Sequence, residues 1–246
     1  MQDYMSMALE AAEQPGGMVP TYIFLQTGVG AMAGAVAGFF CSSYQERMPR
    51  LTIVEPDRAD CLFRTARAND GTLHKVGGAL DSIMACLCCG EVYTIGWEVL
   101  RHQTDCFFSC PDYVAADGMR GLGNPLPESL AIVSDESGAA PAGLVYHLLQ
   151  NEGLEAMKEA VGPDRSSVVL CISTERDTDW MNCRHLVWDS YYVCPRCHIT
   201  MEQEFMNFCD QCDSTWIGRA TKKPESYTLV SVTPYIPDSL KGRVAK

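Results

Sequence analysis

The stretch TYIFLQTGVGAMAGAVAGFF, residues 21–40, decides how the rest of the chain is interpreted. Its apolar start predicts a strand over residues 21–26, and the small apolar residues from Ala31 predict a helix over residues 31–44. Gly28 and Gly30 lie between the two. Such a segment suits a membrane-spanning helix with close-packing glycines, a buried core element, or a phosphate-binding turn at a helix N-terminus.

The membrane alternative rests on residues 23–41, which carry no charge, and on glycines four residues apart at 30, 34 and 38. Gln26 and Thr27 interrupt this run, and no basic flank marks a cytoplasmic side. A strand, a turn and a helix within an α/β core are therefore expected. Backbone N–H groups at the start of the helix can bind phosphate, but on its own this loop favours a tight turn without a ligand.

Strands and helices are predicted to alternate along residues 1–188. The expected strands are 21–26, 51–54, 61–65, 131–134 and 168–173. The expected helices are 2–13, 31–44, 78–88, 96–106, 112–121, 138–150 and 155–161. This order predicts an α/β domain with a mostly parallel sheet, and the apolar run SVVLCIS predicts a strand covered on both faces.

The charge is distributed unevenly along the chain. The net charge is -12; residues 1–188 carry 12 basic and 24 acidic side chains, whereas residues 189–246 carry seven of each. A nucleic-acid surface is not indicated, because phosphate binding needs clustered Lys and Arg. Residues 189–220 form the second predicted unit, a zinc-ribbon-like module, and residues 221–246 are expected to be a poorly ordered tail.

Thirteen cysteines are present, and nine of them are scattered in apolar or mixed surroundings. No basic region followed by an apolar one marks a secretory signal, so a cytoplasmic, reducing compartment is expected. These nine are interpreted mostly as buried thiols, and the odd total argues against a closed disulfide framework. They are Cys41, Cys61, Cys86, Cys88, Cys89, Cys106, Cys110, Cys171 and Cys183.

The other four cysteines form two pairs, CPRC and CDQC, separated by eleven residues. Two CxxC turns at this spacing predict a tetrahedral, structural Zn²⁺ site with four thiolate ligands. His198 is adjacent but is not needed once four thiolates are available. The predicted ligands are Cys194, Cys197, Cys209 and Cys212.

Several motifs within residues 1–188 resemble one enzyme family. They are FLQTGVGAMAG, IVEPDRADCLFR, VGGALDSIMACLCCGE, GWEVLR, CPDYVAADGMRGLGNP, SDESGA and VVLCISTERDTD. Together they resemble the C-terminal half of diaminopropionate ammonia-lyase, a pyridoxal 5′-phosphate (PLP) enzyme of the fold-type-II, tryptophan-synthase-β-like class. The resemblance implies an incomplete copy of that fold.

The resemblance also implies site residues. The loop that holds the PLP phosphate through backbone N–H groups corresponds to Gly28, Val29, Gly30, Ala31 and Met32. Ser173 corresponds to the hydroxyl residue that faces the pyridine nitrogen, and its alternative role is a helix N-cap. Glu136 and Ser137 correspond to a segment beside the cofactor ring. Further family positions, for which capping or salt bridges are expected instead, are Asp57, Asp60 and Asp81.

Two departures from the family pattern affect what the chain is expected to do. Arg176 replaces a glycine, which predicts a distorted loop or weaker cofactor binding. The lysine that binds PLP covalently lies, in the family, upstream of the glycine loop, in a half that this sequence does not show. The lysines present are Lys75, Lys158, Lys222, Lys223, Lys241 and Lys246.

The expected function is therefore the PLP-binding part of a lyase of amino-acid catabolism. In the family the reaction is α,β-elimination of 2,3-diaminopropionate to pyruvate and ammonia, and this chain is expected to be inactive alone. Its expected partners are an amino-acid substrate, a separately supplied N-terminal half or partner chain, and a second copy in a homodimer. The alternative is a zinc-ribbon interaction protein that carries a degenerate enzyme domain.

Overall fold

The fold is built on a five-stranded sheet with the strand order β4-β1-β2-β3-β7. The computed structural model describes residues 3–14, 18–150, 152–176 and 178–187, and the short strands 192–193, 200–201 and 233–235. The first four strands of the sheet are parallel, and β7 pairs antiparallel with β3. This confirms the predicted α/β class and mostly parallel sheet. The strands are β1 (Tyr22–Gln26), β2 (Arg50–Pro56), β3 (Cys106–Cys110), β4 (Val169–Cys171) and β7 (Thr233–Tyr235).

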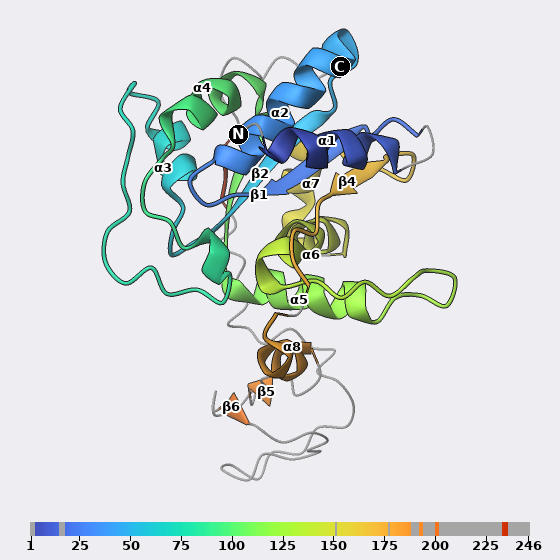
Figure 1. The fold of residues 1–246 in the computed structure, drawn as a ribbon. Helices are drawn as coiled ribbons and strands as arrows, with labels where there is room; N and C mark the ends of the chain where they lie inside the picture. Colours follow the sequence, from blue (N-terminus) through green and yellow to red (C-terminus); the bar gives the residue numbers. More distant parts are fainter. Residues whose placement is uncertain are drawn as a thin grey trace.

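Helices cover both faces of the sheet (Figure 1). On one side lie α1 (Asp3–Glu13), α2 (Ala31–Tyr44), α3 (Cys61–Ala68) and α4 (Thr94–Gln103). On the other lie α5 (Asp112–Gly123), α6 (Glu136–Gln150) and α7 (Glu155–Val161). The helix α8 (Trp180–Val187) packs against α5. Short 3₁₀ turns span Gln45–Arg47 (η1), Ala85–Leu87 (η2) and Glu152–Leu154 (η3).

Strand β1 explains why the sheet is covered on both sides. Ile23 and Leu25 point into the core beneath α1–α4, whereas Tyr22 and Phe24 point into the core beneath α5–α7. All five residues of the strand are buried. Each large apolar side chain buried in this way contributes about 1.5–3 kcal/mol to folding.

Helix α2 lies in the core of the first layer, and its small residues allow close packing. A Cβ added at Gly34 would lie 2.8 Å from the Cα of Gly96 on α4. With 14 residues, α2 is short for a bilayer, and no helix in the described ranges is long and apolar enough to cross one. Gly34 therefore serves helix packing within the α/β core.

One segment that was predicted as a strand is a helix. Residues 61–65 form the first turn and a half of α3, not a strand. The apolar triplet CLF suggested a strand, but Thr65 and Ala66 are buried four residues after the buried Cys61 and Leu62, which is the helical spacing. The buried carboxylate of Glu55 also accepts the N–H groups of Leu62 and Phe63, which fixes the helix start.

Two further predicted elements do not form. Residues 78–88 contain only η2, because Gly78 has a φ of 98° and the Ser82 hydroxyl accepts the N–H of Met84, which competes with a helical turn. Residues 131–134 form no strand; Ile132 donates its N–H to the carbonyl of Leu122 at the end of α5 instead.

The helix predicted over residues 96–106 is too long at its C-terminal end, and the strand that follows it was not predicted. The helix ends at Gln103, and β3 begins at Cys106 beside β2. The Asp105 carboxylate accepts the N–H of Leu51 at 2.7 Å, which aligns the start of β3 with β2. The other predicted helices and the strands at 21–26, 51–54 and 168–173 are confirmed within a few residues.

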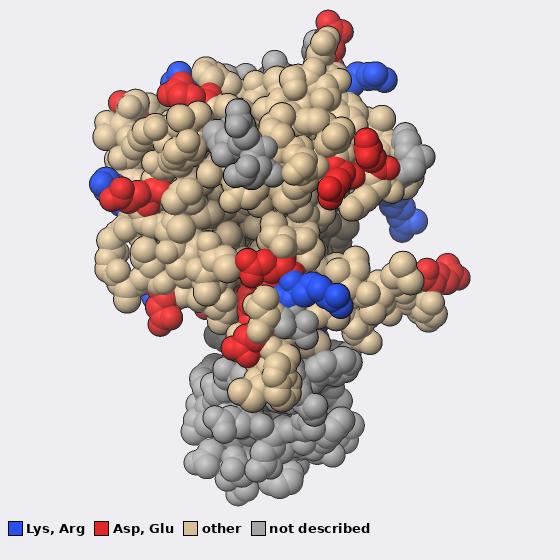
Figure 2. Space-filling model, in the orientation of Figure 1, with Lys and Arg blue, Asp and Glu red and all other residues tan. Residues whose placement is uncertain are grey.

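The predicted C-terminal units lie largely outside the described residues. That part contains Cys194, Cys197, Cys209 and Cys212 and most of residues 221–246. The structure describes there a hairpin of β5 (Tyr192–Val193) and β6 (Thr200–Met201), and β7 at the sheet edge. On the face drawn in Figure 2, the Lys and Arg side chains of the described residues stand apart from one another.

Candidate functional site

The glycine loop connects the carboxyl end of β1 to the start of α2. Gly30 is the N-cap residue of α2 and has a φ of 97°, a conformation that glycine adopts without strain. No side chain caps this helix start, and its first turn contains no acidic residue. The N–H groups of the first turn, together with the helix dipole, therefore favour an anion at residues 28–32.

The loop is held in place by a hydrogen bond and by close packing. The Tyr93 N–H donates to the Val29 carbonyl at 2.8 Å. A Cβ on Gly96 would overlap the Gly30 carbonyl, and a Cβ on Gly28 would lie 3.0 Å from the Cys89 sulfur. These contacts fix the loop before any ligand binds.

A buried carboxylate beneath the loop was missed by sequence analysis. Glu55, at the end of β2, accepts the N–H groups of Leu62 and Phe63 at 2.9 and 2.6 Å. Burial raises the pKa of the Glu55 carboxyl well above its usual range, although these two bonds oppose that shift. The Cys61 thiol donates to the Gly28 carbonyl at 3.8 Å, so α3 connects Glu55 to the glycine loop.

Ser173 lies at the same edge of the sheet, because it follows β4, the parallel neighbour of β1. Its hydroxyl donates to the Ser134 hydroxyl at 2.8 Å. No described helix begins at Ser173, so it has no N-cap role there. Gln26, the last residue of β1, donates to the Ile172 carbonyl at 2.8 Å and holds this segment beside the loop.

The segment before α6 approaches Ser173 through residues that the sequence did not single out. Ser134 bonds Ser173, and the Asp135 carboxylate accepts the N–H groups of Ser137 and Gly138. Glu136 accepts instead from the Asn182 amide of α8 at 2.5 Å. Burial, followed by the nearby Asp135 and Asp179, raises the pKa of the Glu136 carboxyl.

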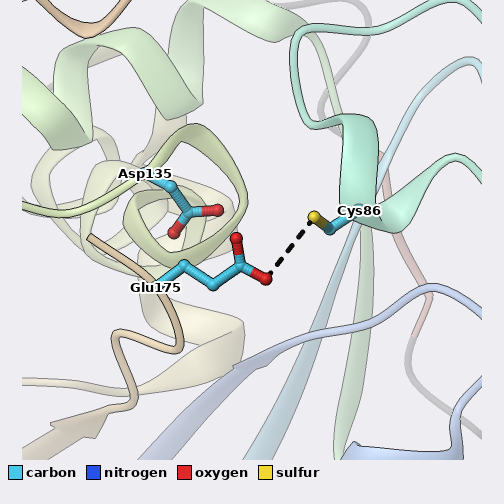
Figure 3. A group of neighbouring side chains, drawn as sticks. All are labelled: Cys86, Asp135 and Glu175. Atoms are coloured by element: carbon cyan, nitrogen blue, oxygen red, sulfur yellow. Dashed lines mark hydrogen bonds between the residues drawn. The ribbon is translucent and has the colours of Figure 1, made fainter. Parts of the chain in front are cut away.

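A second group of side chains meets beside Ser173 (Figure 3). One ligand atom each from Cys86, Asp135 and Glu175 lies within 4.8 Å of the others. The sequence grouped Cys86 with the buried thiols, but the structure places it on the surface. Cys61, another of the nine scattered cysteines, is buried, and burial raises the pKa of the Cys61 thiol to about 12.

The remaining family positions serve structural roles or lie on the surface. Asp60 forms an ion pair with Arg64 at 2.7 Å, and Asp57 forms a longer one with Arg58, whereas Asp81 is exposed. Arg176 is exposed and is not among the described residues with positive φ, so its own backbone does not adopt a conformation reserved for glycine.

Neither lysine within the described ranges lies at the glycine loop. Lys75 is exposed and paired with Glu91 at 2.7 Å. Lys158 is on α7. The C-cap residue of this helix is Gly162, whose carbonyl accepts a hydrogen bond from the hydroxyl of Tyr22 at the amino end of β1. The other four lysines lie outside the described residues.

Comparisons with solved structures first place the fold. The chain superposes on the holo form of Escherichia coli diaminopropionate ammonia-lyase with a TM-score of 0.68 and 40% identity, covering 76% of this chain and 46% of that one. A fungal L-serine ammonia-lyase from Rhizomucor miehei shares the fold at 17% identity, with a TM-score of 0.57 and coverage of 75% and 55%. The four-stranded parallel sheet is thus that of the tryptophan-synthase-β-like PLP enzymes.

The sequence comparison finds relatives of higher identity within this fold class. The chain is 44% identical over 195 residues to the diaminopropionate ammonia-lyase of Escherichia coli K12, a match that covers 78% of this chain and 48% of that protein. No protein-family model matches the chain. The chain is therefore homologous to diaminopropionate ammonia-lyase, and it spans about half the length of the curated relatives it matches.

Proposed function

We propose that this chain carries the phosphate-binding and ring-facing part of a diaminopropionate ammonia-lyase-like enzyme. The observation that carries the proposal is the uncapped, glycine-built start of α2, in a chain that is 44% identical to that lyase over 195 residues. The proposed reaction is α,β-elimination of 2,3-diaminopropionate to pyruvate and ammonia, as part of amino-acid catabolism in the cytoplasm.

The residues of the site fit PLP by their chemistry. The loop at residues 28–32 offers backbone donors and no negative charge, which suits a phosphate group. Leu62 and Leu100 pack against Gly30 and shield the loop from water on that side. Ser173 would offer a neutral hydroxyl to the pyridine nitrogen. PLP, when bound, supplies the electron sink for elimination.

Neither Lys75 nor Lys158 is proposed as the lysine that binds PLP covalently. Lys75 is exposed and paired, and Lys158 lies at the opposite end of β1. The chain by itself is therefore proposed to bind the cofactor without catalysing the elimination. Its proposed partners are a lysine-bearing half, supplied separately, and a second copy in a homodimer.

A charge placed in the first turn of α2 tests the phosphate site. The probe is pyridoxine 5′-phosphate, which lacks the aldehyde that reacts with surface lysines. Ala31→Glu should weaken its binding at least about tenfold by repulsion at short range, whereas Ala31→Gln should retain it. An acidic side chain also stabilises a helix N-terminus, so the Glu variant should be at least as stable as the Gln variant.

Isothermal titration calorimetry measures the binding, and thermal unfolding supplies the stability control. Equal affinities for Ala31→Glu and Ala31→Gln would contradict the phosphate site, and so would equal binding of pyridoxine and its phosphate. Because both variants have side chains of similar shape, a difference between them reports charge and not the space available.

A structural zinc site remains a second proposal, with the four predicted cysteines as ligands. The described hairpin β5–β6 supports it, because the two strands flank the CPRC motif in sequence. Metal analysis of the purified full chain should find one tightly held Zn²⁺, and the double variant Cys194→Ser, Cys209→Ser should lose it. An unchanged zinc content would contradict this proposal.

A further inference from the structure

We propose that Cys86, Asp135 and Glu175 form a second metal site that binds one thiophilic divalent cation of the Zn²⁺ type. The three residues come from separate parts of the chain: η2, the residue before α6, and the segment after β4. Figure 3 shows their side chains directed toward a common space. The proposal uses only these side chains and does not rest on PLP binding.

The spacing of the ligand atoms suits a tetrahedral ion. A Zn–S bond of about 2.3 Å and a Zn–O bond of about 2.1 Å at the tetrahedral angle place sulfur and oxygen about 3.6 Å apart. The Cys86 sulfur and the Glu175 Oε1 are 3.7 Å apart. All three ligand atoms lie within 4.8 Å of one another, so small side-chain rotations complete the site.

The donor set selects the type of metal. One thiolate with two carboxylates suits Zn²⁺, Co²⁺ or Cd²⁺ better than Mg²⁺ or Ca²⁺, which prefer oxygen ligands only. Three protein ligands leave one position open to water or to a small ligand, unlike the closed site predicted for the four C-terminal cysteines. The fourth ligand of the proposed site is therefore exchangeable.

Asp135 is held in the orientation that a ligand needs. It is buried, and its two carboxylate oxygens accept the N–H groups of Gly138 and Ser137 at 2.9 and 3.2 Å. Each oxygen keeps a lone pair for a metal. The Asp135 N–H donates to the Glu175 carbonyl, which ties two of the ligand segments together. Such outer contacts orient metal ligands.

The electrostatics of the cluster favour a cation. Burial, followed by Glu175 and Asp135, raises the pKa of the Cys86 thiol, and burial followed by Glu175 raises that of the Asp135 carboxyl. No ion pair found within the described ranges involves Asp135 or Glu175. A divalent cation would relieve this repulsion, and exposed Cys86 and Glu175 leave a path for its entry.

Cobalt titration of the full chain tests the site. One equivalent of Zn²⁺ is added first to fill the predicted four-thiolate site, and Co²⁺ binding is then followed by its thiolate charge-transfer absorption. The unmodified chain should bind one further Co²⁺ with this absorption. Cys86→Ser should abolish the absorption, and Glu175→Gln should weaken binding about tenfold or more.

Cys88→Ser is the matched control, because Cys88 is in the same segment but its sulfur is directed at the carbonyls of Ser82 and Met84. This variant should bind Co²⁺ like the unmodified chain. The proposal is overturned if the unmodified chain binds no further Co²⁺, or if Cys86→Ser binds it with unchanged affinity and absorption.

Discussion

The glycine loop and the Cys86–Asp135–Glu175 cluster lie at the same edge of the sheet, but they are built differently. The loop offers backbone N–H groups from five consecutive residues, without a charged side chain. The cluster brings together side chains from positions 86, 135 and 175, and two of the three are carboxylates. The first region suits an anion and the second a cation.

The two regions also differ in what holds them in place. The loop is fixed by packing, since a methyl group on Gly96 would overlap the Gly30 carbonyl and one on Gly28 would lie 3.0 Å from the Cys89 sulfur. The cluster has one buried member, Asp135, and two exposed members, Cys86 and Glu175. Substitutions that change packing should therefore affect the loop, and substitutions that change charge should affect the cluster.

The largest effect is expected where α4 contacts the loop. In Gly96→Ala the new Cβ would overlap the Gly30 carbonyl, so the loop or α4 has to move. We expect the free energy of unfolding to fall by about 1–3 kcal/mol, together with weaker binding of pyridoxine 5′-phosphate. Urea denaturation and calorimetry measure the two quantities.

Gly38→Ala is the control for that substitution, because Gly38 is on α2 and an added Cβ would contact only Val99, at 3.9 Å. Alanine has the higher helix propensity, so this variant should be as stable as the parent or more stable by up to about 1 kcal/mol. If Gly96→Ala behaves like Gly38→Ala, the loop is not fixed by packing against α4.

A smaller effect is expected in the cluster. Glu175 helps to raise the pKa of the Cys86 thiol, after the larger contribution of burial. In metal-free protein, Glu175→Gln should therefore lower that pKa and speed alkylation of Cys86 near neutral pH a few-fold. Peptide mapping by mass spectrometry gives the rate at each thiol. Cys88, whose pKa is raised by burial and by other acids, should be unaffected; equal changes at both thiols would contradict a local charge effect.

The order of the main elements could be predicted from the sequence, because each has a local pattern. The run YIFLQ, the glycines and the helix that starts at Ala31 are consecutive, so the β1–α2 unit follows from periodicity alone. The segment at residues 61–65 could not be assigned in this way, since the helix there depends on a carboxylate at position 55. Strand β3 was not predicted for a similar reason, because its alignment comes from pairing with β2.

The candidate site shows the same limit. The loop at residues 28–32 was predicted, whereas the Ser173–Ser134 contact joins residues 39 positions apart, and only the folded chain brings them together. Cys86 had no local signal that separated it from eight other cysteines. Its two carboxylate neighbours follow other elements, and no spacing rule connects them to it.

The central claim is that the glycine loop binds a phosphate group, and the backbone amides of the loop test this most directly. In an amide ¹H–¹⁵N NMR titration of the full chain with pyridoxine 5′-phosphate, the resonances of residues 29–32 should shift to saturation, and pyridoxine at the same concentration should leave them in place. Shifts confined to other residues, or equal shifts with both compounds, would contradict the assignment of this loop as a phosphate site.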